Sequence, residues 1–248
     1  MKCCNVYEDS SIKEVLGQTL RPGGFSLTEK SVRFCGFEPG DAVLDLGCGM
    51  GATVGYLYER YGIKAVGVDP SEKLIGFARE SYKFTDFILG RGENIPFNES
   101  SFKGVFAECT LSLMEDLSTA LNEIYRVLKK GGWLVITDVY AKNPIHIKEL
   151  HGISINSCIR GLHDLKHLEK QLIELGFNII LLEDYSDLLK SLMVKIVLSY
   201  GSMDAFWNKT TDNYAGACEL NKTLKECKPG YFLMIARKGD ADYERYGI

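Results

Sequence analysis

Short apolar runs alternate with amphipathic segments along the first 140 residues of the chain. The apolar runs, which are typical of buried strands, lie at residues 42–46, 65–68, 87–89, 104–107 and 133–137. Apolar residues at helical spacing separate them, at 26–36, 51–61, 71–82 and 117–129. Strands that are apolar throughout and alternate with helices predict a parallel sheet with helices on both faces.

The pattern is less regular after residue 140. It predicts helices at 164–175 and 186–200 and strands at 178–182 and 231–236, and a further short helix at 11–20 precedes the regular part. The stretch between the last two strands is long for a compact domain, which predicts a lid or a cap there.

Composition narrows the class of protein without naming it. Hydrophobic residues make up 46% of the 248 residues, charged residues 25%, and the formal charge is −4, which is ordinary for a globular protein. The chain contains no basic tract that would suggest a nucleic-acid partner. It also contains no apolar run of about 18 residues that would suggest a membrane span. The N-terminus shows no apolar signal-peptide region, so the eight cysteines are expected to be reduced thiols in the cytoplasm. They include no CxxC pair, and no metal site is expected.

The most informative stretch is VLDLGCGMGATVGYL, residues 43–57. Here a strand leads into Gly47, Gly49 and Gly51 and then into a helix, with Asp45 just ahead. Such a loop lets a ligand approach the backbone without meeting Cβ atoms, and the helix N-terminus offers free N–H groups. The third glycine comes one residue too early for the GxGxxG loop of nicotinamide dehydrogenases. A nucleotide cofactor other than NAD is therefore favoured.

Three further features follow in order. Asp69 ends the second strand, where a carboxylate can accept the hydroxyls of a ribose, although it could instead cap the helix that begins near Ser71. The loop GRGENIPF, residues 90–97, follows the third strand and can flank an adenine ring. RVLKKGG, residues 126–132, leads into the fifth strand.

VLDLGCGMG, VGVDPS, GENIPFNESSF and RVLKKGGWLVITD, taken together, resemble the successive motifs of class I S-adenosylmethionine (SAM) dependent methyltransferases. The resemblance covers roughly residues 40–140. Within the class it is most similar to the small-molecule group that includes quinone-biosynthesis and arsenite methyltransferases. It implies a Rossmann-like, doubly wound seven-stranded α/β sheet, mostly parallel with an antiparallel last strand.

The resemblance also implies one domain over residues 1–248. Residues 1–36 would form an N-terminal helical cap, 37–140 the SAM-binding core, and 141–248 a C-terminal half whose insertion at 186–228 forms a lid. The implied activity is methyl transfer from SAM to a small-molecule acceptor, which leaves S-adenosylhomocysteine (SAH). A monomer or homodimer is expected.

Cofactor residues are carried over from the family by position. Asp45 would orient the glycine loop and the methionine amino group, Asp69 would bind the ribose, and Pro70 would lie against the adenine. The remaining implied cofactor residues are Gly47, Cys48, Gly49, Gly51, Gly92, Glu93 and Glu108. Arg91 replaces the acid that the family often carries, and an arginine cannot accept a hydrogen bond from the adenine amino group. The adenine contact is therefore expected from the Gly92–Glu93 backbone or from Glu93 itself.

Acceptor-side residues are predicted more loosely, because the motifs do not identify the acceptor. The N-terminal segment, the region after the fifth strand and the late insertion are expected to enclose it, with Tyr7, Arg21, Tyr140, Cys158 and Trp207 as candidates, and Phe206 beside Trp207. Arg21 could hold the SAM carboxylate or an anionic acceptor. No catalytic base is assigned, and His163 and His167 are interpreted as a solvated helix face.

Two alternatives stay open. Cys158 lies in a segment that resembles the one carrying a metalloid-binding thiol in arsenite methyltransferases, which would make thiol or metalloid methylation the reaction. The shared second cysteine after the glycine loop is absent from Ala52–Val54. A non-catalytic SAM-binding scaffold would keep the same cofactor motifs.

Overall fold

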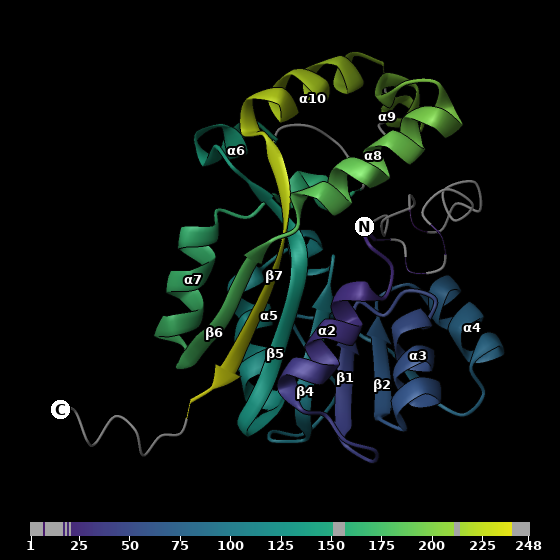
Figure 1. Cartoon of the computed structure of the whole chain (residues 1–248), viewed down its shortest axis with the longest axis vertical. Coiled ribbons are helices and arrows are strands. Elements are labelled where there is room, and N and C mark those ends of the chain that lie inside the picture. Colours follow the sequence, from purple (N-terminus) through teal and green to yellow (C-terminus); the bar gives the residue numbers. More distant parts are fainter. Residues whose placement is uncertain are drawn as a thin grey trace.

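Seven strands form one sheet in the order β3-β2-β1-β4-β5-β7-β6 (Figure 1). The computed structural model describes Tyr7, Gly17, Thr19 and residues 21–150, 157–210 and 214–239. The strands are β1 (Ala42–Leu46), β2 (Lys64–Asp69), β3 (Asp86–Leu89), β4 (Phe102–Glu108), β5 (Leu128–Ala141), β6 (Phe177–Asp184) and β7 (Pro229–Lys238). The predicted helix at 11–20 falls almost entirely outside the described residues.

Helices connect the strands. The α-helices are α2 (Ser26–Cys35), α3 (Ala52–Tyr61), α4 (Glu72–Ser81), α5 (Leu117–Val127), α6 (Ile147–Leu150), α7 (Leu165–Glu174), α8 (Ser186–Tyr200), α9 (Met203–Thr210) and α10 (Tyr214–Cys227). Three short 3-10 turns are η2 (Leu111–Leu113), η3 (Pro144–His146) and η4 (Cys158–Gly161).

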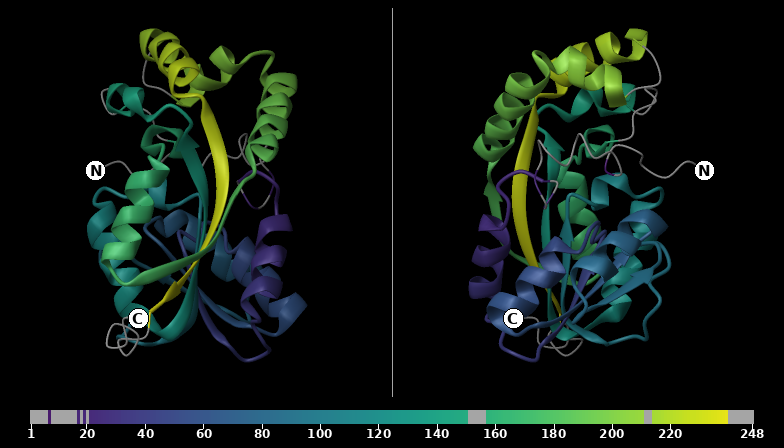
Figure 2. Two further views of the ribbon diagram at one scale, coloured as in Figure 1. Left: turned by 60° about the vertical axis from the view of Figure 1, so that its left-hand side comes forward. Right: turned by 90° about the vertical axis from the view of Figure 1, so that its right-hand side faces the viewer.

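Strand direction matches the predicted fold class. All neighbouring pairs from β3 to β5 are parallel, whereas β7 is antiparallel to both β5 and β6. β7 runs between β5 and β6 along the length of the sheet (Figure 2). The chain therefore has the mostly parallel sheet with an antiparallel last strand that the sequence predicts.

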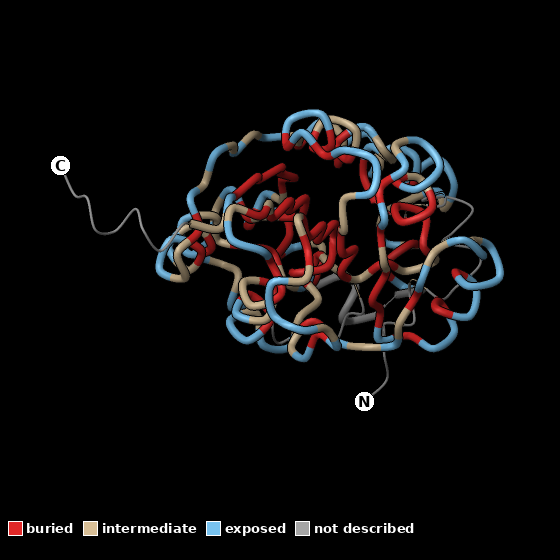
Figure 3. Tube along the Cα trace, turned by 90° about the horizontal axis from the view of Figure 1, so that it is seen from below, coloured by how far each residue is buried: buried red, intermediate tan, exposed pale blue. Residues whose placement is uncertain are grey.

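Alternate strand residues face two separate hydrophobic clusters. Val43, for example, packs in the cluster that also contains residues of α2, α3 and α4, whereas Leu44 packs in the cluster with α5 and α7. This is the period of two that places successive side chains on opposite faces of a sheet. Buried residues are concentrated along the strands, and the outer surfaces of the helices are largely exposed (Figure 3). The prediction of helices on both faces is confirmed.

Differences from the predicted elements are confined to a few boundaries. The helix predicted at 117–129 ends at Val127, and β5 begins at Leu128 because Leu128 pairs with Phe102. The ladder is irregular between Phe102 and Gly104, where Gly131 has a φ of 69°. Most of the polar stretch 203–228 forms the two helices α9 and α10.

The excursion from β6 to β7 lies beyond one end of the sheet. α8, α9 and α10 gather there together with α6, at the carboxyl ends of β5 and β6 (Figure 1). Among the described helices, none combines the length and the apolar character that crossing a bilayer requires.

Candidate active site

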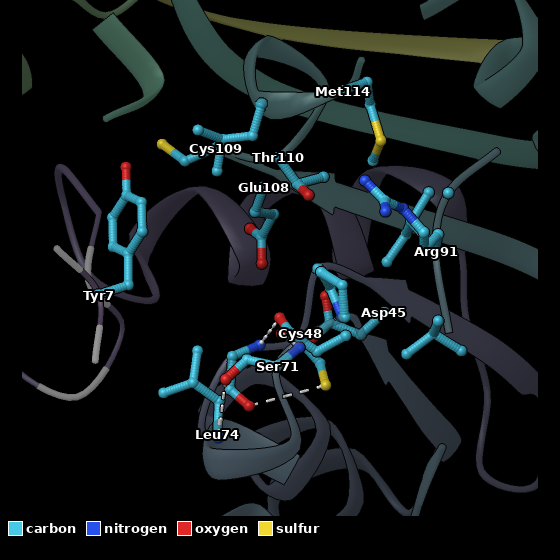
Figure 4. A pocket seen from close by; sticks show the side chains of 18 of the residues that line it. Tyr7, Asp45, Cys48, Ser71, Leu74, Arg91, Glu108, Cys109, Thr110 and Met114 are labelled. Atoms are coloured by element: carbon cyan, nitrogen blue, oxygen red, sulfur yellow. Dashed lines mark hydrogen bonds between the residues drawn. The ribbon is translucent and has the colours of Figure 1, made fainter. Parts of the chain in front are cut away.

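A cavity of about 950 Å³ opens at the carboxyl ends of β1, β2 and β4. In open parallel sheets, ligands bind beyond these strand ends, where the strand order reverses. Most residues that the sequence predicts for the cofactor, and two of those predicted for the acceptor, line the cavity: Asp45, Gly47, Cys48, Gly49, Asp69, Pro70, Gly92, Glu93, Glu108, Tyr7 and Arg21. Figure 4 shows Glu108 pointing into the cavity, with Tyr7 on one side and Arg91 on the other.

The glycine loop bends sharply at the end of β1. Gly47, Gly49 and Gly51 all have positive φ, at 74°, 53° and 80°. A Cβ on Gly47 would lie 2.0 Å from Thr110 Oγ1, so the segment between β4 and η2 packs directly against the loop there. A Cβ on Gly49 would meet nothing within 4 Å. The loop backbone at Gly49 is thus open toward the cavity, as a ligand that approaches the main chain requires.

Asp69 is tied to this loop. Its carboxylate accepts hydrogen bonds from Gly49 N at 2.9 Å and from Ser71 N at 2.9 Å. The helix cap of α4 is Ser71, whose hydroxyl accepts a hydrogen bond from Leu74 N. Asp69 therefore joins the end of β2 to the glycine loop while the neighbouring serine caps the helix.

Asp45 lies in an acidic environment. Burial and the nearby carboxylates of Glu108 and Asp69 together raise its pKa to about 8, against the opposing effect of Arg21. Three carboxyl groups thus border one cavity. A ligand that carries positive charge would relieve the repulsion among them.

Glu108 is held by residues of three other elements. Arg21 Nη2 lies 2.9 Å from Glu108 Oε2, Thr28 Oγ1 donates to Oε1 at 2.8 Å, and Thr53 Oγ1 donates to Oε2 at 3.1 Å. Arg21 also donates to both threonine hydroxyls, at 2.7 and 2.9 Å. Arg21 is therefore engaged with protein groups, although the sequence suggested it for an anionic group of a ligand.

The loop after β3 forms the opposite side of the cavity. Glu93 Oε1 accepts hydrogen bonds from Glu115 N at 2.9 Å and from Asp116 N at 3.4 Å. Arg91 forms an ion pair with Glu115 at 2.9 Å. A Cβ on Gly92 would lie 2.5 Å from Met114 Cε, so Met114 packs against the loop backbone. The Glu93 side chain faces the start of α5, which leaves the backbone of this loop for a ligand.

Tyr7 and two cysteines, Cys109 and Cys158, lie close together beside the cavity. Cys158 N donates to the Tyr7 hydroxyl at 3.0 Å, and the Cys109 thiol lies 3.4 Å from the Tyr231 hydroxyl. A hydrogen bond from Cys109, and a further one from Tyr7, lower the pKa of the Cys158 thiol. Burial and the contact with Cys158 raise the pKa of Cys109. Cys109 itself has a φ of 55°, a left-handed conformation that is uncommon outside glycine.

Several predicted residues do not line the cavity. Gly51 packs against Phe87, where a Cβ would lie 2.5 Å from the ring. Tyr140 donates to Asp184 at 2.8 Å, and Trp207 is buried against Phe206 in α9. Cys158 lies behind Tyr7 and Cys109. Of the described cavity-lining residues, none belongs to α8, α9 or α10.

The interpretation of His163 as part of a solvated helix face is wrong. His163 precedes α7, is only 6% exposed, and has Nε2 3.4 Å from Asp138 Oδ2. It lies beside Tyr140, to which it forms an isolated bridge. Pairing between the segment before α7 and β5 is a long-range contact that no local pattern indicates.

Cavity residues missing from the sequence analysis come from the segments after β4 and before α7. They include Thr110, Ser112, Leu113, Met114, Ser157, Arg160 and Gly161. Their position directly after a predicted strand was the one signal that could have indicated η2. Within the described residues, no group of three or more His, Cys, Asp or Glu side chains is placed to hold a metal ion.

Comparison with known families settles the class. A family model described as a methyltransferase domain matches residues 44–136, the span from β1 to β5 that carries the glycine loop and Asp69. Residues 44–136 of this chain therefore form a methyltransferase domain. The family and the fold class predicted from the motifs are confirmed, and SAM is the methyl donor of that family.

Relatives of this methyltransferase chain are longer proteins. Phosphoethanolamine N-methyltransferase 3 of Arabidopsis thaliana is 29% identical over 189 residues, which are 73% of this chain and 38% of that protein. The chain spans 34–38% of the length of the first three curated relatives it matches.

Solved structures share the fold at lower identity. The cyclase SpnF has a TM-score of 0.74 at 21% identity and covers 95% of this chain and 93% of its own. Phosphoethanolamine N-methyltransferase 2 of Haemonchus contortus, solved with S-adenosyl-L-methionine, has a TM-score of 0.71 at 21% identity, over 93% of this chain and 56% of its own. One of these two structures is thus named as a cyclase, so the fold does not by itself fix the reaction.

Proposed function

We propose that the chain binds SAM in the cavity at the ends of β1, β2 and β4 and transfers its methyl group to a small-molecule acceptor. The observation that carries this proposal is the joined pair of Gly49 and Asp69. It presents an open glycine backbone beside a buried carboxylate at the switch point of the sheet.

The residues present fit SAM by charge and by shape. When bound, SAM supplies a methyl group that its positively charged sulfur already activates. Five acidic residues line the cavity, namely Asp45, Asp69, Glu93, Glu108 and Glu115, against the three arginines Arg21, Arg91 and Arg160. We assign Asp69 to the ribose hydroxyls and the backbone of Gly92 and Glu93 to the adenine edge, because the Glu93 carboxylate is bound to the start of α5.

Cys48 and Pro70 line the same side of the cavity, and we assign them to the cofactor with Gly47 and Gly49. Asp45 and Glu108 lie at the end of β1 and β4, where we place the methionine part. We assign Gly51 an indirect role, because its lack of a side chain lets α3 start close to Phe87.

The acceptor is assigned to the side lined by Tyr7, Cys109, Ser112 and Arg160, because no cofactor motif falls there. Relatives that act on phosphoethanolamine make a small amine one candidate. Cys109 contacts Cys158 and would supply a second thiol for the alternative reaction, the methylation of a thiol or a metalloid.

Three further parts of the proposal concern the whole protein. Residues 1–36 and 186–228 form a cap and a lid that order around the ligands, for which the contact of Gly23 with Leu188 of α8 gives support. Five described cysteines are free thiols, in keeping with a reducing cytoplasm. We propose a monomer or homodimer that does not bind nucleic acid.

Calorimetry with SAM, SAH and NADH tests the cofactor. We expect dissociation constants for SAM and SAH on the order of micromolar. Binding of NADH without SAM would overturn the proposal. Incubation with methyl-labelled SAM and metabolite extracts then tests transfer, and binding without any labelled product would favour the scaffold alternative.

A further inference from the structure

A chain of hydrogen bonds leads from the cavity wall into the sheet through Ser112, Asp138 and His163. Ser112 belongs to η2 and lines the cavity. Its hydroxyl donates to Asp138 Oδ1 at 2.7 Å, and its backbone N donates to Asp138 Oδ2 at 3.0 Å. His163 Nε2 lies 3.4 Å from the same Oδ2. Nothing in the cofactor motifs accounts for this arrangement.

Asp138 is a fully buried acid surrounded by donors. It is 0% exposed and also accepts a hydrogen bond from Val139 N at 2.8 Å. Its two oxygens accept three hydrogen bonds, two from Ser112 and one from Val139 N. The proton of the Ser112 hydroxyl is therefore committed to Asp138.

The consequence concerns what Ser112 can offer to a ligand. With its proton directed inward, the hydroxyl presents only oxygen lone pairs to the cavity. A hydroxyl that donates to an anion is also a stronger acceptor, because hydrogen bonds in a chain polarise one another. Ser112 can thus accept a hydrogen bond from a ligand and cannot donate one without releasing Asp138.

The position of Ser112 is fixed by its neighbours. A Cβ on Gly161 of η4 would lie 1.9 Å from Ser112 O, so η4 packs directly on η2. Cys109 and Tyr7 line the same side of the cavity. This is the side that the proposed function gives to the acceptor.

We infer that Ser112 contacts the methyl acceptor and selects acceptors whose attacking atom is a strong hydrogen-bond donor, namely the N–H of amines and the O–H of hydroxyl compounds, in preference to the weakly donating S–H of thiols. Asp138 fixes the direction of the Ser112 hydroxyl and receives its proton in the reaction, whereas His163, beside Asp138, is a positioning residue. The inference rests on the proposed function and deepens it, since it gives the acceptor atom as nitrogen or oxygen.

A lone pair on the acceptor nitrogen or oxygen forms the bond to the methyl carbon, while the carbon–sulfur bond breaks and its electron pair stays on sulfur. The proton of the attacking atom passes to Ser112 Oγ as the Ser112 proton passes to Asp138. The products are the methylated acceptor and SAH, and the proton on Asp138, which is fully buried, returns to the cavity through Ser112 once the products leave.

The test uses the full chain, methyl-tritiated SAM and four pools of probe compounds: primary amines including phosphoethanolamine, alcohols and phenols, thiols, and thioethers. Mass spectrometry locates the added methyl group. We expect it on nitrogen or oxygen. A methyl group found only on sulfur or carbon would overturn the inference and leave the proposed function standing. If the chain binds SAM but methylates no compound of any pool, the inference and the proposed function would both fail.

Variants separate a direct contact from a structural role. For the methylated compound, Ser112→Ala should lower kcat/KM by about 10- to 100-fold, which corresponds to the loss of one charge-supported hydrogen bond, and Ser112→Thr should restore most of it. SAH affinity should stay within about twofold. Ser101→Ala is the matched control, because it removes a serine hydrogen bond, to Asn98 O, far from the cavity lining. Equal activity of Ser112→Ala and Ser101→Ala would overturn the inference.

Asp138→Asn provides an independent readout. The new amide can donate to Ser112 Oγ, which turns the hydroxyl proton toward the cavity. We expect the ratio of kcat/KM for amine or hydroxyl probes to that for thioethers, which lack the hydrogen, to fall by at least about tenfold. An unchanged ratio in a folded Asp138→Asn protein that still binds SAH would show that Ser112 does not select the acceptor.

Discussion

Arg21 and Glu108 form a buried ion pair, with Arg21 Nη2 2.9 Å from Glu108 Oε2 and both side chains almost fully buried. The pair joins the segment before α2 to the end of β4. Since Thr28 and Thr53 bind the same two groups, the N-terminal segment, α2 and α3 all meet at Glu108. This junction fixes the wall of the cavity before any ligand enters.

Breaking this pair should cost stability. Arg21→Ala leaves the Glu108 carboxylate buried without its cation, and we expect a loss of about 3 kcal/mol, the lower end for a buried pair because this one borders the cavity. Urea unfolding measures it. The double variant Arg21→Met with Glu108→Leu should recover most of the loss. A double variant less stable than Arg21→Ala would contradict the role of the pair.

Asp69→Ala should weaken SAH binding by about 1.5–3 kcal/mol, because the ribose hydroxyls lose a charged hydrogen-bond acceptor. The variant also removes the hydrogen bond that Gly49 N donates to the Asp69 carboxylate. Calorimetry measures the change. Ser71→Ala is the control, since it removes the cap of α4 at about 1 kcal/mol of stability and leaves the Asp69 carboxylate in place. Equal SAH affinity in the two variants would show that Asp69 serves only the helix start.

Asp45 should make stability fall as pH rises. Its pKa is raised to about 8 in the folded chain by burial and by Glu108, whereas an unfolded Asp titrates near 4. Between these values the folded state binds more protons than the unfolded state, so the free energy of unfolding decreases with pH over this window. Asp45→Asn should flatten this part of the curve and be more stable than the parent at pH 8. A parent-like slope would show that Asp45 is already ionised.

The same group should couple SAM binding to proton release. A cation beside Asp45 favours the carboxylate and lowers its pKa, so binding at pH 7 should expel a proton. Calorimetry in two buffers of different ionisation enthalpy reports it. Asp45→Asn should abolish the difference between buffers, whatever its own SAM affinity.

Cys158 should be the first of the five described free thiols to react with iodoacetamide at neutral pH. Hydrogen bonds from Cys109 and Tyr7 lower its pKa, while burial raises that of Cys35 to about 12 and also raises that of Cys227. Alkylation follows the thiolate. Cys109→Ala should slow the reaction, as followed by peptide mass spectrometry. Faster labelling of Cys227 than of Cys158 would refute this assignment.

Gly47 and Gly49 should respond differently to alanine. Both have positive φ, which costs about 1 kcal/mol for a side chain. Only at Gly47 would the Cβ meet Thr110 Oγ1, at 2.0 Å, whereas at Gly49 it meets open space. Gly47→Ala should therefore destabilise the chain by about 1–3 kcal/mol more than Gly49→Ala in urea unfolding. Thr110→Gly should relieve part of that excess.

The sequence predicts the strands and turns around the glycine loop well because their signals are local. β1 matches the expected strand at both ends, since the turn before it and Gly47 after it mark its limits. β5 is longer than expected because Leu128 pairs with Phe102 of β4, a contact between residues distant in the sequence. The acceptor side is harder for the same reason. Ser112 and His163 meet through Asp138, and no spacing along the chain indicates that contact.

β7 returns between β5 and β6 in the opposite direction, so α8, α9 and α10 leave the sheet and re-enter it at the same edge. The ends of this excursion, at Asp184 and Pro229, are fixed by the ladders, but its length is not. A longer or shorter excursion would leave every strand pairing in place. The three helices are therefore a replaceable module: transplanting those of another chain onto the same two strands would change this end of the molecule and leave the cavity, which none of their described residues lines, unaltered.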